Sequence, residues 1–203
     1  MTKISSSEKG ITLIEVLLTL VIMSIVSGVI YSVFATGLKL YQKIGIEAQF
    51  RDDADYIATM ILNQMYNSPP DYIKEVKDGS TTIGIEMVRY EKKKVDGYLV
   101  EDSTAINKKL RVYYQDEKFF IESINPTTNT VEEKNEIATE SSKLTTNGSG
   151  TESSISLTCS KENTNGECQH GTINLNIVIG DKHEFQSNFL KTDPLELPSS
   201  FGF

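Results

Sequence analysis

The chain has few histidines and few cysteines. Its 203 residues include two histidines, His170 and His183, and two cysteines. A Ser/His/Asp assembly would need one of these histidines, and neither lies in a GxSxG or metal-binding helix motif. We interpret both histidines as polar positions of strands or loops. The sequence therefore predicts a protein that is not an enzyme and has no cofactor or metal ion.

Charged side chains are absent from Val16 to Leu38, although 24% of all residues are charged. A helix over this segment would be roughly 34 Å long at ~1.5 Å per residue, enough to cross a ~30 Å hydrocarbon layer. We therefore predict a single-pass membrane protein. Lys3 and Lys9 precede the span, so the positive-inside tendency places the N-terminus in the cytoplasm and the C-terminal part outside it.

A cleavable secretory signal peptide is an alternative interpretation of the same segment. Such a peptide also has a basic start and an apolar stretch, with a cleavage site after small residues. The residues from Ser24 to Gly28 would supply such a site. Against this interpretation, the apolar run continues beyond Gly28 to Phe34.

Proline is absent before Pro69, so none interrupts a helix in the N-terminal part of the chain. Beyond the apolar segment, hydrophobic residues recur at spacings of three and four, which predicts an amphipathic helix face. These residues are Phe50, Ala54, Ile57, Ala58, Ile61, Leu62 and Met65. Ser68-Pro69-Pro70 is a strong helix stop. We expect one helix over residues 12–67, membrane-spanning in its first half and amphipathic in its second.

After the prolines, the hydrophobic pattern changes from helical to alternating. Segments rich in strand-forming residues predict an antiparallel meander, and they lie at 82–87, 97–101, 110–114 and 118–124. Its apolar face would cover the second half of the helix. The predicted fold class is therefore α+β, with a long N-terminal helix packed on an antiparallel β-sheet domain.

The C-terminal third has a different composition. Residues around 125–155 are rich in Asn, Thr, Ser and Glu, which predicts a polar insertion that is either a long surface loop or partly disordered. Residues 172–179 and 183–189 alternate on either side of Gly180-Asp181, which predicts a terminal hairpin. Because of Pro194 and Pro198, we expect the tail to be irregular.

The two cysteines, Cys159 and Cys168, lie on one side of the predicted span in a polar stretch. Outside the cytoplasm a disulfide would close this short loop and add ~2–3 kcal/mol of stability in the chain-entropy model. Alternatively, both cysteines would bind zinc together with His170. That site lacks a fourth ligand, and its spacing matches no standard zinc pattern.

The net charge of −8 gives the protein a surface that repels phosphate backbones. One basic cluster is a candidate phosphate-binding patch, formed by Lys92, Lys93, Lys94, Lys108, Lys109 and Arg111. Acidic residues between Glu91 and Asp102 offset its charge. We therefore do not favour direct binding of nucleic acid.

The junction Lys9-Gly10-Ile11-Thr12-Leu13-Ile14-Glu15 resembles the processing site of type IV prepilins and of the pseudopilins of secretion and DNA-uptake systems. The resemblance implies that a prepilin peptidase cuts between Gly10 and Ile11 and methylates the new amino terminus. The usual first mature residue of this family is Phe, and Ile11 departs from it but remains apolar. The resemblance covers only the N-terminal segment, and the globular part contributes no motif.

The resemblance also implies a role for Glu15, the fifth residue of the mature chain. An ionised side chain in the hydrocarbon region is costly and usually has a partner. In a filament, Glu15 would neutralise the amino terminus of a neighbouring subunit, and the low dielectric would make the subunit register specific. The alternative is that Glu15 only complements the dipole of its own helix.

We therefore predict a non-enzymatic structural subunit, minor or tip-associated, of a type IV pilus-like or pseudopilus filament at the cell surface, serving a pilus, DNA uptake (competence) or type II secretion. The domains would be a leader at 1–10, a transmembrane and filament-core helix at 11–38, an amphipathic continuation at 39–68 and an extracytoplasmic β-rich domain at 69–203. Its partners would be prepilin peptidase, other pilin-like subunits, a membrane assembly platform and membrane lipid. The alternatives are a membrane-anchored extracytoplasmic binding domain that does not polymerise and, less favoured, a secreted hydrolase.

Overall fold

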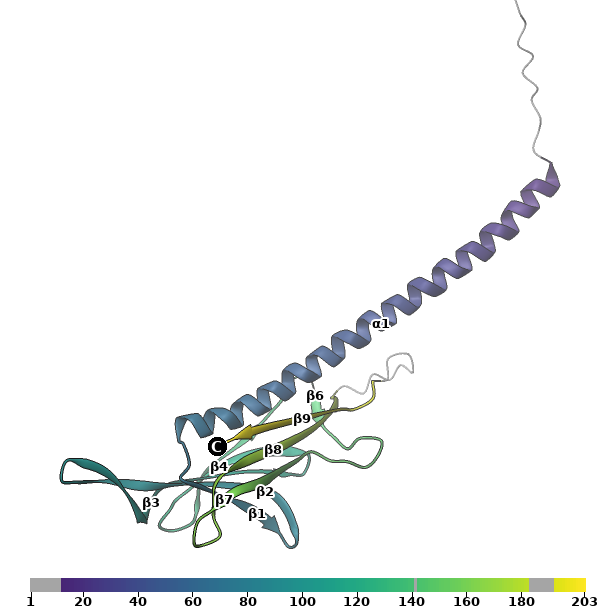
Figure 1. Ribbon diagram of the computed structural model, residues 1–203. Helices are drawn as coiled ribbons and strands as arrows, with labels where there is room; N and C mark the ends of the chain where they lie inside the picture. The colour runs from purple at the N-terminus through teal and green to yellow at the C-terminus, as the bar shows by residue number, and fades with distance from the viewer. Residues whose placement is uncertain (1–11, 141, 183–191) are drawn as a thin grey trace, which may run out of the picture. The chain divides into compact units, whose positions relative to one another are not determined.

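The computed structural model describes residues 12–140, 142–182 and 192–203. In these residues, one long helix precedes nine strands, which confirms the predicted α+β class (Figure 1). The chain divides into two compact units, Met1–Ile44 and Gly45–Phe203. Each unit is described by itself below.

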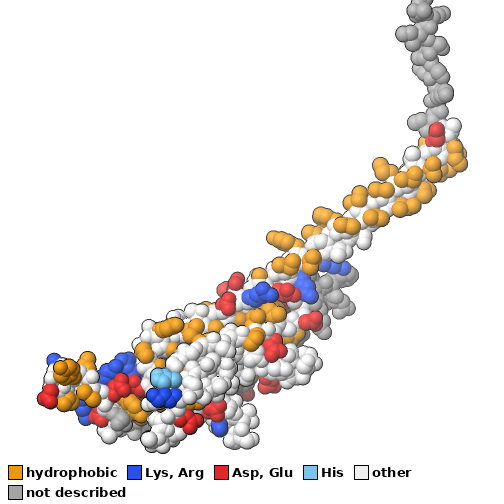
Figure 2. All heavy atoms as spheres, viewed as in Figure 1, with side chains coloured by type: hydrophobic (Ala, Val, Ile, Leu, Met, Phe, Trp, Pro, Cys, Tyr) orange, Lys and Arg blue, Asp and Glu red, His pale blue; other side chains and the backbone are white. Residues whose placement is uncertain are grey.

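The first unit contains the N-terminal half of helix α1 (Leu13–Asn67). Every large hydrophobic side chain from Leu13 to Ile44 is exposed, on all sides of the helix. Figure 2 shows hydrophobic side chains distributed along this half of α1 on the face in view. An exposed apolar area of this extent marks a surface that is covered by lipid or by protein.

The second unit begins with the C-terminal half of α1, which is amphipathic as predicted. Its buried residues are Phe50, Ala54, Ile57, Ile61 and Met65, at spacings of three and four. Ala58 and Leu62 pack against the same core and are partly buried. The helix ends at Asn67, directly before Ser68-Pro69-Pro70, where the sequence predicted its end.

Five strands follow the helix as an antiparallel meander in the order β5-β4-β3-β2-β1. They are β1 (Tyr72–Asp78), β2 (Thr81–Val95), β3 (Tyr98–Gln115), β4 (Lys118–Ile124) and β5 (Val131–Ile137). Two of the turns have positive φ at both central residues, Asp96-Gly97 and Asp116-Glu117. This is the backbone geometry of two-residue hairpins, and it matches the twist of the flanking strands.

Four further strands complete the nine-stranded sheet. They are β6 (Ser142–Leu144), β7 (Ser154–Glu162), β8 (Cys168–Asp181) and β9 (Leu195–Gly202). Strand β8 pairs antiparallel with β6, β7 and β9, and one residue pair, Ile73 with Cys168, links it to β1. Alternate residues of β8 from Ile173 to Ile179 are buried and form one hydrophobic core with α1.

Close packing within the meander depends on one glycine. A Cβ atom added to Gly84 in β2 would lie 2.3 Å from the carbonyl oxygen of Val112 and 2.4 Å from the Cβ atom of Tyr113 in β3. Such distances are far below van der Waals contact, so any other residue would push β2 and β3 apart.

The region expected to be a polar surface loop, residues 125–155, contains β5, β6 and the start of β7. Its composition misled the prediction, because six of the seven residues of β5 are exposed. Strand β5 lies at the end of the strand order, with β4 as its neighbour. A strand in that position needs few apolar residues to be stable.

Two predictions about the C-terminus are also wrong. Gly180 and Asp181 belong to β8 and pair with β6, so they do not form a turn. The tail is not irregular, because β9 pairs with β8 along eight residue pairs. Pro198 fits there because an edge strand tolerates a residue without an N–H group. The predicted strand at 183–189 lies outside the described residues.

Candidate assembly site at the start of helix α1

Thr12 and Glu15 form a reciprocal capping arrangement at the start of α1. The Glu15 Oε2 atom accepts hydrogen bonds from the backbone N of Thr12 at 2.9 Å and from its hydroxyl at 3.0 Å. In return, the backbone N of Glu15 donates to Thr12 Oγ1 at 3.4 Å. This is the capping box, in which a Thr at the N-cap and a Glu three residues later satisfy backbone N–H groups of the first turn.

The capping box was missed in the sequence, although its signal is present there. Thr12-Leu13-Ile14-Glu15 fits the pattern of Ser or Thr followed three residues later by Glu or Gln. The structure therefore shows that Glu15 caps the first turn of its own helix. A carboxylate at this position also complements the helix dipole. Oε1 takes part in neither of the two bonds to Thr12.

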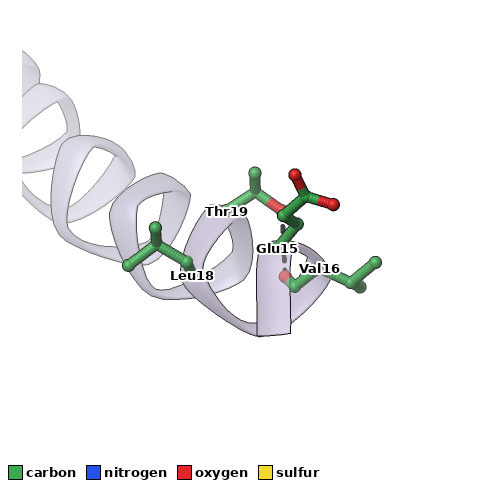
Figure 3. Close-up of a pocket in the computed structure, with 4 residues that line it drawn as sticks. All are labelled: Glu15, Val16, Leu18 and Thr19. Atoms are coloured by element: carbon green, nitrogen blue, oxygen red, sulfur yellow. Dashed lines mark hydrogen bonds between the residues drawn. The ribbon is translucent and has the colours of Figure 1, made fainter. Parts of the chain in front are cut away.

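The surroundings of Glu15 are apolar and open. Glu15, Val16, Leu18 and Thr19 line a shallow hollow on the side of the helix (Figure 3). The Thr19 hydroxyl donates to the carbonyl oxygen of Val16 at 2.9 Å, and is therefore satisfied within the helix. The predicted cleavage junction, Gly10–Ile11, lies outside the described residues, so the structure does not show where the amino terminus of Ile11 would lie.

The membrane-spanning prediction agrees with the length and composition of α1. This helix, which lies near the N-terminus of the chain, is long and apolar enough to cross a membrane. No residue of its most apolar segment is buried. The residues that follow Glu15 therefore have the character of a segment that lies in lipid or in the apolar interior of an assembly.

Small residues recur at every fourth position of the same segment, namely Ser24, Gly28, Ser32 and Thr36. The hydroxyl of Ser24 donates to the carbonyl oxygen of Leu20 at 2.8 Å, and that of Thr36 to Ser32 at 2.9 Å. Their polar atoms are thus satisfied within the helix. Small residues at this spacing allow the backbone of another helix to approach closely in an apolar environment.

Cys159 and Cys168, near the ends of β7 and β8, are joined by a disulfide. Because their sulfur atoms are bonded to each other, they do not form the zinc site with His170 that the sequence left open. No group of three potential metal ligands occurs among the residues that the structure describes.

Next to the disulfide, Lys74 in β1 forms an ion pair with Glu167 at 2.6 Å. Burial raises the pKa of Glu167, but hydrogen bonds from Lys74 and Asn163 outweigh it and hold this pKa below its usual range.

We expect the disulfide to form in the extracted protein and to stabilise the second unit. Reduction should lower the free energy of unfolding by ~2–3 kcal/mol, because it restores loop entropy to the unfolded chain. Non-reducing peptide mapping should show the Cys159 and Cys168 peptides joined, and denaturant unfolding with and without reductant should measure the loss. Protein alkylated without reduction is the control. Free thiols on both cysteines of freshly extracted protein would contradict this prediction.

The structure separates the basic residues that the sequence grouped as a candidate phosphate site. Lys109 and Arg111 both pair with Glu86, at 3.3 and 2.9 Å. Lys93 forms an ion pair with Asp102 near the β2–β3 turn. These basic groups are thus neutralised locally, and the pairing gives no support to a phosphate-binding patch.

Of the two candidate histidines, the structure describes His170. His170 is exposed on β8, where its backbone pairs with Lys161 in β7. His183 lies outside the described residues. Of the residues predicted to act in processing and assembly, the structure describes Glu15, and it places this residue in the capping box at the start of α1.

The comparison with known families also points to this segment. Residues 5–31 match the family model of the prokaryotic N-terminal methylation motif. The matched range contains Gly10, Ile11 and Glu15 together with the first half of the apolar helix. No curated protein and no solved structure matches the chain. The N-terminal segment of the chain is therefore similar to that of prepilin-type, type IV pilin-like proteins, and its helix is long and apolar enough to cross a membrane.

Proposed function

We propose that the protein is a structural subunit, and not an enzyme, of a type IV pilus-like or pseudopilus filament. The observation that carries this proposal is the first half of α1, whose large hydrophobic side chains from Leu13 to Ile44 are exposed on every side. Before assembly, lipid covers this surface. After assembly, the same surface packs against the corresponding helices of neighbouring subunits in the filament core.

Cleavage between Gly10 and Ile11 would place a cationic amine four residues before Glu15. Oε2 of Glu15 is occupied by Thr12, and Oε1 takes no part in those bonds. In the apolar filament core, this carboxylate neutralises the amine of the neighbouring subunit. Because either charge alone would be costly in that environment, the pair favours one register between subunits.

The small residues of α1 support the same packing. A Cβ atom added to Gly28 would meet no atom within 4 Å in the isolated chain. The glycine is thus not required for the fold of the subunit, and another helix has room to approach there. Close helix packing in an apolar medium depends on van der Waals contact at such small residues.

The domain plan of this proposal is a leader at 1–10, a filament-core helix at 11–38, an amphipathic continuation at 39–68 and a β-rich domain at 69–203. The β-rich domain faces the extracytoplasmic side, where its disulfide is stable. A membrane assembly platform would move the subunit from lipid into the filament. The polar region around 125–155, which adds β5, β6 and the start of β7 to the sheet, suits a minor or tip-associated subunit more than a compact major one.

We expect the mature protein to begin at Ile11 and to carry an N-methyl group. The N-terminal peptide of protein isolated from membranes should show this mass, because the motif matched at residues 5–31 is the substrate of such processing. Mass spectrometry of that peptide is the measurement. Gly10→Val is a matched control, since it leaves the apolar helix unchanged and should leave the chain intact from Met1.

Two outcomes would contradict the proposed processing. An intact Met1 start in the wild-type chain would mean that no peptidase acts at this junction. A start beyond Ser27 would indicate a cleaved secretory signal peptide, which removes most of the apolar segment and with it the means of assembly.

A further inference from the structure

Two loops of the second unit, 147–151 between β6 and β7 and 163–167 between β7 and β8, have the same hydrogen-bonding pattern. Each begins with an asparagine whose Oδ1 atom accepts bonds from the backbone N–H groups two and four residues later, at 2.9 and 2.8 Å for Asn147 and at 2.9 and 2.9 Å for Asn163. The backbone N–H of that asparagine donates to the carbonyl oxygen of the fifth residue at 2.9 Å in both loops. The fourth residue is a glycine with a φ of 80° in the first loop and 74° in the second, a conformation that glycine adopts without strain. The two loops thus have one geometry.

Both loops contain an Asn-Gly pair, but at different positions. In the first loop the pair is Asn147-Gly148, at the first and second positions, and in the second loop it is Asn165-Gly166, at the third and fourth. An asparagine before a glycine loses its side-chain amide more easily than other asparagines, because glycine has no side chain to hinder attack by its backbone nitrogen on Cγ. The two pairs therefore allow a comparison of the same dipeptide in two settings of one fold.

Three hydrogen bonds hold the side chain of Asn147. Besides the two bonds that Oδ1 accepts, Nδ2 donates to Oε2 of Glu196 in β9 at 3.1 Å. The residue is also partly buried. For the backbone nitrogen of Gly148 to reach Cγ, the side chain has to rotate out of all three bonds. The fold therefore opposes loss of this amide.

The side chain of Asn165 is held much less. Asn165 is exposed, and within the described part of the chain its side chain makes no hydrogen bond. Its backbone N–H donates to Asn163, which leaves the side chain able to rotate. The nitrogen of Gly166 donates to the carbonyl oxygen of Asn163 at 3.1 Å, and this bond has to break before the nitrogen can attack. One exposed hydrogen bond thus protects this pair, against three at Asn147.

We infer that Asn165-Gly166 is a site of spontaneous deamidation in the folded chain and that Asn147-Gly148 is protected from it. The backbone nitrogen of Gly166 forms a bond to Cγ of Asn165, the bond between Cγ and Nδ2 breaks, and the proton of the Gly166 nitrogen leaves with the ammonia. Water then opens the resulting succinimide ring to aspartate or isoaspartate. Solvent water is the one co-reactant, and neither an oxidant nor a reductant is needed.

The modification would act where β8 meets β1. The next residue after the pair, Glu167, forms the ion pair with Lys74 at 2.6 Å, and Cys168 forms the residue pair with Ile73 that links the two strands. Isoaspartate adds one methylene group to the main chain of a five-residue loop, so the bonds between its first and fifth residues cannot keep their geometry. Either product also places a new carboxylate two residues before Glu167, and like charges repel.

The test compares the rate of deamidation in the folded and the unfolded chain. The full chain, extracted in detergent, is incubated at neutral pH, and a second sample is incubated in denaturant. After reduction, cleavage at lysine places the two pairs in separate peptides, 144–161 and 162–182. Mass spectrometry then measures aspartate and isoaspartate in each peptide with time. Folding should slow the reaction at Asn147 at least about tenfold more than at Asn165, because two more hydrogen bonds have to break.

Exchange of residues between the loops provides the matched test. Ser149 and Asn165 are the third residues of their loops, and both are exposed. Ser149→Asn places an Asn-Gly pair at the third and fourth positions of the first loop, and this amide should be lost at a rate close to that of Asn165. Asn165→Ser should remove the fast reaction from the second peptide. The denaturation midpoints of both variants should equal that of wild type, because neither side chain is buried.

Three outcomes would overturn the inference. They are equal or greater slowing at Asn165 on folding, a folded chain that keeps the Asn165 amide while the unfolded chain loses it, and a stable amide at position 149 in Ser149→Asn. The inference does not rest on the proposed function. The experiment reads neither the N-terminus nor the filament fraction, so its failure leaves the proposed function unaffected.

Discussion

Glu15→Gln should abolish incorporation of the subunit into filaments while leaving its insertion and processing intact. Gln has the shape of Glu and also serves at the third position of a capping box, so the start of α1 keeps its cap. Only the negative charge is removed. The cationic amine of the neighbouring subunit would then lie without its partner in an apolar contact, so we expect the fraction of subunit in filaments to fall at least about tenfold.

The measurement is the ratio of the subunit in sheared filaments to the subunit in the membrane, for the variant and for wild type.

Thr12→Val is the matched control for this experiment. It removes the hydroxyl that bonds Glu15 Oε2 at 3.0 Å. Val is nearly the same size as Thr, and Glu15 keeps its negative charge. This variant should assemble well, because the capping hydroxyl matters for the helix end and the charge matters for the partner. If Glu15→Gln enters filaments as well as wild type, Glu15 serves only the N-terminus of its own helix.

Ile57→Ala should strongly destabilise the second unit without affecting the membrane-spanning half of α1. Ile57 is completely buried between the helix and the sheet. Deleting its side chain removes apolar contacts and leaves a cavity, which typically costs ~2–5 kcal/mol of unfolding free energy. Denaturant unfolding of the full chain in detergent, followed by near-ultraviolet circular dichroism, measures this loss.

Tyr56→Ala is the matched control, because Tyr56 is the neighbouring residue on the exposed side of the same helix. Its removal should change the free energy of unfolding by less than ~0.5 kcal/mol, as for most surface substitutions. Equal losses for the two variants would contradict the packing of α1 on the sheet.

The helix could be predicted nearly to the residue because several signals agree there. The spacing of Phe50, Ile57 and Ile61 sets the buried face, and Pro69 and Pro70 set the end. The strands from 82 to 124 were predicted in part, because alternation and strand-forming residues coincide at 82–87 and 118–124. The segments 97–101 and 110–114 belong to one strand, β3, and β1 was not predicted. These are local signals, and local signals are what a single sequence carries most reliably.

The elements that were missed depend on tertiary pairing. Strand β9 contains Pro198 and is stabilised by its pairing with β8, which a local reading of the tail does not reveal. Strand β5 is polar because it pairs with β4 at the end of the strand order. The capping box at Thr12 and Glu15, in contrast, was readable from the sequence.

The central claim is that the mature chain is a filament subunit held by its N-terminal helix. The measurement that tests it most directly is mass spectrometry of the N-terminal peptide in the sheared filament fraction. The account predicts that this fraction contains the chain and that its N-terminus is N-methylated Ile11. Mature chain that stays entirely in the membrane fraction, while other subunits are recovered in sheared filaments, would contradict the account and favour an anchored domain that does not polymerise.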